Sequence, residues 1–124
     1  MTVKEAIDRV DHVKPNTYSL EEKLRWLSLL EANVIDEVIN THEPKEAHVE
    51  DFHGFEDWML EYSLCAEFPH DEIYVAYLKM KIDEENGETT MYNNSVTAYN
   101  NLWTAFSKAY NKAHAPISTP FSIY

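Results

Sequence analysis

The sequence predicts an all-α fold, a four-helix domain with an irregular, partly extended segment between helices two and three. Only 2 glycines occur among 124 residues, too few for the tight turns of a β-rich chain. Apolar side chains recur at spacings of three and four along several stretches, which is the period of one helical face. A chain of this length, 44% hydrophobic, buries one core but not two. We therefore expect a single helical domain, residues 1–114, and an extended C-terminal tail, residues 115–124.

The first two helices are predicted from apolar spacing and from residues that begin and end helices. Residues 2–13 repeat apolar side chains every three or four positions and end before Pro15, which biases the preceding residue away from helical angles. Residues 19–42 open with Ser19 and, three positions later, Glu22, the pattern of a capping box. Their apolar face is wide enough for burial in a bundle. We expect this second helix to be the central one.

Residues 43–69 follow no helical period, because prolines, histidines, acids and aromatic residues are mixed there. The stretch FEDWMLEYSLCAEF, residues 55–68, fits the period of two of a β-strand only in part. It is compatible with a short strand pair or with an irregular hydrophobic lid. We expect an extended segment with some strand.

The third helix is bounded on both sides. Asp71 and Glu72 lie at its N-terminus, where the helix dipole favours acids, and Asn86-Gly87 is typical of a left-handed helix end. Acids at positions 83 to 85 crowd its C-terminal end, where the dipole disfavours them. They either have a role beyond local stability or are solvated on a frayed last turn, and we expect the second. The predicted inner face consists of Ile73, Ala76, Tyr77 and Met80.

The fourth helix carries no charge in the 19 positions between Glu88 and Lys108, although 26% of the chain is charged. It must end near His114, because Pro116 cannot continue a helix. One stripe is aromatic at heptad spacing and is expected to pack inward: Tyr92, Val96, Tyr99, Trp103, Phe106 and Tyr110. A stripe of smaller residues beside it allows a neighbour to approach closely: Met91, Ser95, Ala98, Leu102, Ala105 and Ala109.

The remaining face of this helix is polar and uncharged, rich in Asn and Thr, which are poor helix formers. Uncharged hydrogen-bonding groups tolerate burial against another protein better than charges do. The face is either in contact with a neighbouring subunit, which we expect, or a polar surface in water without a partner. The predicted interface residues are Asn93, Asn94, Thr97, Asn100, Asn101 and Thr104.

The tail, APISTPFSIY, has two prolines and no charge, whereas a disordered end is normally polar and charged. Its apolar residues are Ile117, Phe121, Ile123 and Tyr124. The tail either folds back over its own bundle or binds a partner, and we expect it to bind a partner.

The charge and the cysteine content exclude several classes of protein. With 10 Lys and Arg against 22 Asp and Glu, the net charge is −12, so the surface repels nucleic-acid phosphates. No apolar run is long enough to span a membrane. Cys65 is the single cysteine, which excludes an intrachain disulfide, and the first residues lack the apolar stretch of a secretory signal. We expect a cytosolic chain that contacts no membrane.

No motif points to catalysis, to a cofactor or to a metal. The stretch HVEDFH, residues 48–53, holds possible metal ligands without the spacing of a zinc site. Neither a Gly-rich phosphate loop nor a nucleophile elbow is present, and Cys65 lies in an apolar context typical of a core thiol. We therefore expect a chain that is not an enzyme and has no cofactor or metal.

Three stretches carry a resemblance to a known family: KPNTYSLEEKLRWLSLLEANVIDEVINTHE, PHDEIYVAYLKMKIDEENGE and YNNSVTAYNNLWTAFSKAYNKAH. They resemble the small head-tail connector, or adaptor, proteins of tailed bacteriophages and of prophages in Gram-positive bacteria. The resemblance implies a virion protein, assembled in the host cytoplasm, that forms a cyclic ring of about a dozen copies. It also implies contacts with the portal protein and with a stopper or tail completion protein, while DNA passes through the ring without specific binding.

In such a ring an acidic bore would let DNA slide without sticking, although acidity also serves solubility alone. The tail would dock on the portal as an added strand, with Phe121 and Tyr124 as anchors. The alternative is an acidic regulatory or DNA-mimic protein that occupies a nucleic-acid-binding partner. Self-association distinguishes the two, because a connector needs a ring-closing, head-to-tail interface.

Overall fold

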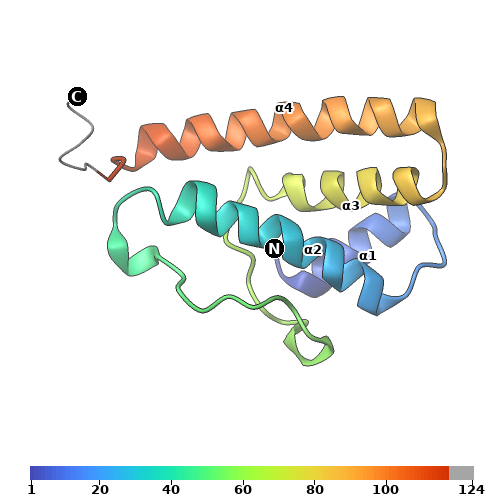
Figure 1. The fold of residues 1–124 in the computed structure, drawn as a ribbon, viewed down its shortest axis with the longest axis horizontal. Coiled ribbons are helices and arrows are strands. Elements are labelled where there is room, and N and C mark those ends of the chain that lie inside the picture. Colours follow the sequence, from blue (N-terminus) through green and yellow to red (C-terminus); the bar gives the residue numbers. More distant parts are fainter. Residues whose placement is uncertain (118–124) are drawn as a thin grey trace.

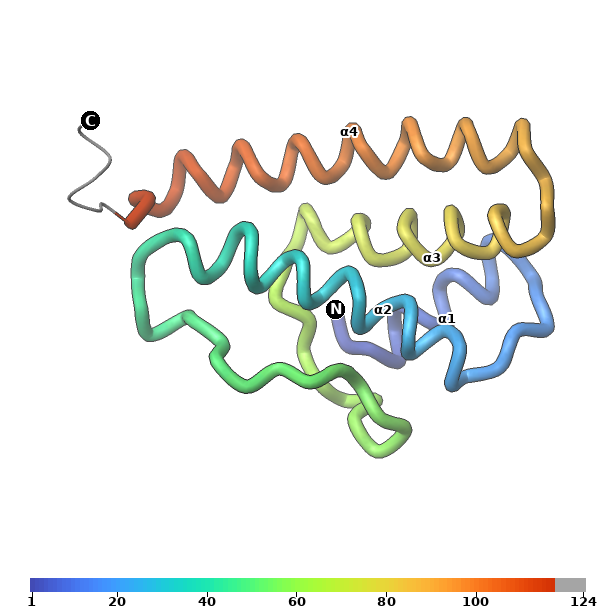
Figure 2. The backbone as a smooth tube through the Cα atoms, viewed as in Figure 1, coloured from blue at the N-terminus to red at the C-terminus, as the bar shows by residue number. Residues whose placement is uncertain are grey.

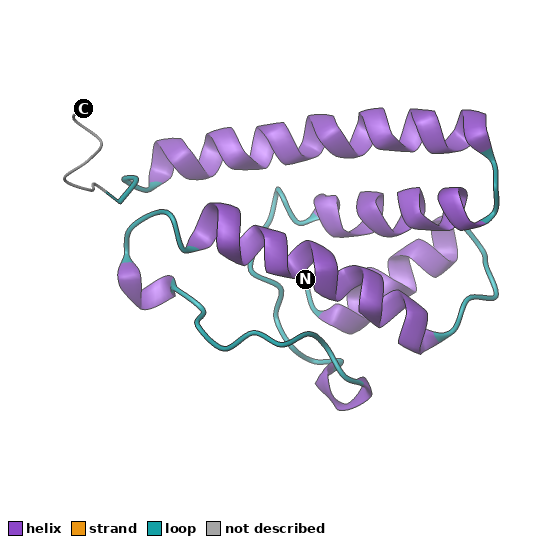
Figure 3. Ribbon diagram, in the orientation of Figure 1, coloured by secondary structure: helices purple, strands orange, loops and turns teal. Residues whose placement is uncertain are grey.

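Four α-helices make up the computed structural model, which describes residues 1–117 and contains no β-strand within them. The helices are α1 (Val3–Val13), α2 (Leu20–Val34), α3 (Glu72–Glu85) and α4 (Thr89–Ala113), and a π-helical turn (Ile35–Ile39) prolongs α2 (Figures 1 and 3). The all-α prediction with four helices is confirmed. None of these helices is both long and apolar enough to cross a bilayer.

Helix α3, and not α2 as expected, is the central helix. It packs against α1, α2 and α4, and α4 lies along its far side as the outermost helix (Figures 1 and 2). Because α3 has neighbours on several sides, its apolar residues are not confined to one stripe. The predicted inner face was therefore wrong in part. Ile73 is buried as expected, but Ala76, Tyr77 and Met80 are only partly buried, and the other core residues of α3 are Tyr74, Val75, Leu78 and Ile82.

The helix ends follow the local sequence closely. Ser19 Oγ accepts the Glu22 N–H at 3.1 Å, but the predicted capping box there is only half formed. The complete box is at α1, where Thr2 Oγ1 accepts the Glu5 N–H at 3.1 Å and Glu5 Oε1 accepts the Thr2 N–H at 3.0 Å. After α3, Gly87 has a φ of 71°, the left-handed conformation in which glycine carries no Cβ penalty.

Residues 43–69 form an irregular segment between α2 and α3, as predicted, and we call this segment the lid. The strand that was expected within it is absent. The lid contains two short 3-10 turns, Lys45–Ala47 and Asp57–Met59, and a single isolated bridge between Ser63 and Thr2. The lid's carbonyls accept hydrogen bonds from the first turn of α1: Val3 N–H donates to Tyr62 O at 3.0 Å and Lys4 N–H to Leu60 O at 2.9 Å. These N–H groups have no partner within their own helix. These two carbonyls of the lid thus accept hydrogen bonds from the N–H groups of α1 instead of pairing with other residues of the lid.

The aromatic stripe of α4 packs inward as predicted. Phe106 is fully buried, and Tyr99, Trp103 and Tyr110 are partly buried against the core. The rings of Tyr77 and Tyr99 meet edge to face across α3 and α4 at 5.3 Å, a favourable aromatic geometry. This packing fixes which side of α4 remains outside.

Candidate functional site

The outer face of α4 is exposed and carries no charged residue between Glu88 and Lys108. All six residues predicted as interface are exposed there: Asn93, Asn94, Thr97, Asn100, Asn101 and Thr104. Thr97 Oγ1 donates to Asn93 O within the helix at 3.2 Å. The amides of Asn94, Asn100 and Asn101 form no hydrogen bond with residues 1–117. Their donors and acceptors are therefore open to a partner or to water.

Apolar side chains border this polar surface. Met91 is 47% exposed and Leu102 is 37% exposed, and Ala98 and Ala105 are exposed between them. The stripe of smaller residues thus faces outward over most of its length, with Ser95 as its buried member. The outer face is therefore a mixture of amides, hydroxyls and apolar groups without charge, and depletion of charge is typical of the cores of protein interfaces.

The start of the tail is fixed against its own chain. Glu43 N–H donates to Ala115 O at 2.7 Å, and Ile117 N–H donates to Thr41 O at 3.0 Å. These two bonds make an antiparallel bridge in which Pro116 lies opposite His42. Of the predicted partner-binding residues, Ile117 is partly buried, while Phe121, Ile123 and Tyr124 lie outside the described residues.

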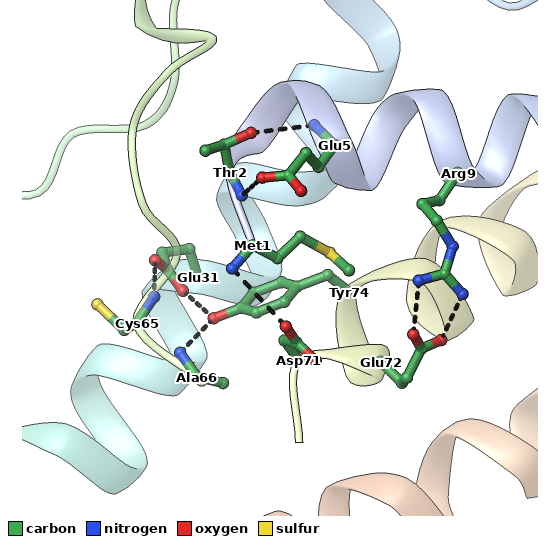
Figure 4. A network of polar contacts seen from close by, with 10 residues as sticks. All are labelled: Met1, Thr2, Glu5, Arg9, Glu31, Cys65, Ala66, Asp71, Glu72 and Tyr74. Atoms are coloured by element: carbon green, nitrogen blue, oxygen red, sulfur yellow. Dashed lines mark hydrogen bonds and ion pairs between the residues drawn. The ribbon is translucent and has the colours of Figure 1, made fainter. Parts of the chain in front are cut away.

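A buried polar network joins α2, α3 and the lid (Figure 4). Glu31 is 0% exposed; its Oε1 accepts the Tyr74 hydroxyl at 2.6 Å and its Oε2 accepts the Cys65 N–H at 2.9 Å. The Tyr74 oxygen in turn accepts the Ala66 N–H at 2.9 Å. A buried carboxylate without donors would be very unfavourable. These bonds therefore hold the lid to the bundle.

Burial controls the chemistry of this network. Burial raises the pKa of the Glu31 carboxyl, although its donors act in the opposite direction. Burial, followed by the neighbouring Glu31 charge, raises the pKa of the Cys65 thiol to about 12. Since the thiolate is the nucleophile, Cys65 is unsuited to covalent catalysis. The hydrogen bonds of the network connect α2, α3 and the lid.

A second buried acid was predicted wrongly. Asp83 is not solvated on a frayed turn but 0% exposed, where it accepts the Ser95 hydroxyl of α4 at 2.5 Å. Lys14 Nζ lies 3.0 Å from Asp83 Oδ1, which makes an ion pair. Glu85 is exposed, as expected, and Glu84 is exposed but paired with Lys81 at 2.8 Å. Asp83 therefore links α1, α3 and α4.

The stretch HVEDFH does not gather into a metal centre. Its first histidine, His48, donates from Nε2 to His42 O at 2.7 Å, and Glu50, Asp51 and His53 are exposed. Within residues 1–117 no three His, Cys, Asp or Glu side chains are arranged to hold a metal ion.

Sequence reasoning missed two exposed aromatic residues of the lid, Trp58 at 75% and Phe68 at 87% exposure. They lie in a segment without periodicity, so no pattern separated them from its buried members. Glu31 was missed too, although its place between Leu30 and Val34 on the apolar face of α2 was a readable signal.

No protein-family model matches the chain, and no curated protein or solved structure is recognisably similar to it.

Proposed function

We propose that this chain is a structural subunit of a tailed-phage head-tail connector, which assembles into a ring between the capsid portal and the tail. The observation that carries the proposal is the uncharged outer face of α4, from Met91 to Ala105. The sequence resemblance supports the same role. In this proposal the function is mechanical, and the subunit catalyses no reaction.

The position of this face suits a ring subunit. From Met91 to Ala105 the helix rises about 21 Å at 1.5 Å per residue, a length suited to a helix-mediated contact. The residues of this face are exposed, so a neighbour can bind them without disturbing the core. Part of the face also lines a hollow that α3 shares: Met91, Asn94 and Ala98 of α4 with Ala76, Lys79 and Asp83 of α3. A ring closes when this face meets a different surface on the next subunit, a head-to-tail arrangement.

The remaining contacts follow from the same arrangement. The portal protein and a stopper or tail completion protein would bind the two ends of the ring, the tail residues contacting the portal. The net charge of −12 would disfavour DNA adhesion in the bore, so that DNA passes without specific binding. The proposed location is the virion, after assembly in the host cytoplasm.

A charge placed in the outer face tests the proposal. Asn101→Glu should prevent ring formation, because the carboxylate would be desolvated in the interface. The matched control is Asn33→Glu, the same change at an exposed position of α2. Light scattering over a concentration series, with and without the portal protein of the same phage, measures the mass of each species.

We expect rings from wild type and from Asn33→Glu, and monomers from Asn101→Glu. A single monomeric mass for all three proteins under every condition, portal included, contradicts the connector role. Such a result would leave the DNA-mimic alternative, which does not require a ring.

A further inference from the structure

A groove of about 530 Å³ lies where the last turns of α4 meet the end of α2 and the residues before α3. Within residues 1–117, Glu67 is the one acid that lines it, although the chain has 22 acids. Its other polar side chains are those of His70, His114, Tyr110 and Cys65. The apolar and aromatic lining includes Ile39, Ala47, Phe68, Phe106, Tyr110 and Ala113. Such a surface is suited to an uncharged, apolar ligand.

Residues 115–117, which precede the end of the chain, lie at the rim of this groove. The hydrogen bond between Glu43 N–H and Ala115 O lies directly between groove residues, since Pro44 and His114 are among the lining side chains. The antiparallel pairing passes Ala115 and then Ile117 along residues 43 to 41. Ile39, which precedes Thr41 by two residues, is a residue of the groove wall.

We infer that the groove binds residues 118–124, STPFSIY, of the same chain. This segment has no charge and carries three large apolar side chains, Phe121, Ile123 and Tyr124, which match the lining. Its seven residues reach about 23 Å when extended. A tethered segment also has an effective concentration of about millimolar, so that weak apolar contacts suffice. The inference concerns the free subunit and holds whether or not the connector role is correct.

A neighbouring hollow of about 440 Å³ is a poorer match. It lies between α4 and the π-helical turn that prolongs α2, and charged or polar side chains such as Glu37, Lys108 and Asn111 line it. Burying Phe121 or Tyr124 beside these groups would desolvate them without replacing their hydrogen bonds.

Disulfide trapping in the full chain tests the inference. Ser122→Cys places a thiol in the tail without removing an apolar side chain, and Ala47→Cys places a second thiol on the far wall of the groove. The matched control combines Ser122→Cys with Lys45→Cys, an exposed position of the same 3-10 turn that does not line the groove. Oxidised glutathione is the oxidant, and peptide mapping with non-reducing electrophoresis identifies each bond.

We expect the Ala47→Cys pair to form an intrachain disulfide at least tenfold faster than the Lys45→Cys pair. A bond from the new tail thiol to native Cys65, which also lines the groove, supports the inference equally. Equal rates for the two pairs overturn it. So does a predominance of disulfide-linked dimers, which would mean that the tail occupies a second copy.

Discussion

Tyr74 is the residue at which three segments of the chain meet. Its hydroxyl donates to Glu31 of α2 at 2.6 Å and accepts from Ala66 of the lid at 2.9 Å. The side chain itself is fully buried on α3. The Ala66 N–H and Glu31 Oε1 therefore share one oxygen atom as their partner.

Tyr74→Phe should lower the free energy of unfolding by about 2 to 3 kcal/mol, because it leaves the buried Ala66 N–H and one oxygen of the buried Glu31 carboxylate without a partner. Urea denaturation monitored by circular dichroism measures the loss. Tyr77→Phe on the same helix is the control, since the Tyr77 hydroxyl has no hydrogen-bond partner in residues 1–117. If both variants unfold at the same urea concentration as wild type, the network contributes nothing.

Glu31 makes stability depend on pH in a specific direction. Its pKa is raised in the folded state, so the folded protein binds a proton more readily than the unfolded chain does. Its contribution to the free energy of unfolding is therefore greatest below the unfolded pKa and is lost as the pH rises through the folded pKa. Urea denaturation gives the free energy of unfolding of wild type and of Glu31→Gln. The wild-type value minus the variant value should grow as the pH falls from 7.5 toward 4.5. A difference that shrinks on acidification would mean that the hydrogen-bond donors outweigh burial.

At the scale of elements, Asp83 connects three helices that the chain order separates. The carboxylate belongs to α3, Ser95 to α4, and Lys14 follows α1 directly. Asp83→Asn should reduce the free energy of unfolding by about 1 to 3 kcal/mol, because it removes a buried charge-assisted hydrogen bond and an ion pair. Thermal and urea unfolding measure the change.

Glu85→Gln is the control for that change, since Glu85 lies two residues away on the same helix and is exposed. It should leave the unfolding midpoint nearly unchanged. Equal effects of the two substitutions would mean that Asp83 acts only through the net charge of the chain.

Helix boundaries were predictable from the sequence because they depend on nearby residues. Pro15, Ser19, Gly87 and Pro116 each act within a few positions of a helix end, and the structure places the ends accordingly. The buried face of α3 was not predictable from its own period, because three neighbours surround that helix. Asp83 was misassigned for a related reason, since its partners Lys14 and Ser95 come from other elements.

The same distinction applies to the two candidate surfaces, the outer face of α4 and the groove. The outer face of α4 was predictable because one helical period defines it. The groove was not, because α2, α4 and the segment before α3 each contribute part of its wall.

At the scale of the whole molecule, the net charge of −12 opposes association between copies. Raising NaCl from 20 to 300 mM shortens the screening length from roughly 20 Å to about 6 Å. Ring formation by a connector should therefore become more favourable with salt, as sedimentation velocity at fixed protein concentration would measure. Binding of a DNA mimic to a basic partner should weaken instead. Assembly that dissociates steadily with added salt would contradict a ring held by the uncharged face of α4.

The hydrogen bonds between the first turn of α1 and the lid determine when α1 can be held in place during synthesis. Val3 and Lys4 donate to Tyr62 and Leu60, and Leu64 N–H donates to Met1 O at 2.9 Å. These contacts close a loop of roughly sixty residues. The entropic cost of closing the loop comes before the free energy that the hydrogen bonds contribute. On the ribosome, α1 emerges before the lid and lacks these acceptors until the lid has also left the exit tunnel. Helix α1 is therefore made before the lid but is held in place only after it.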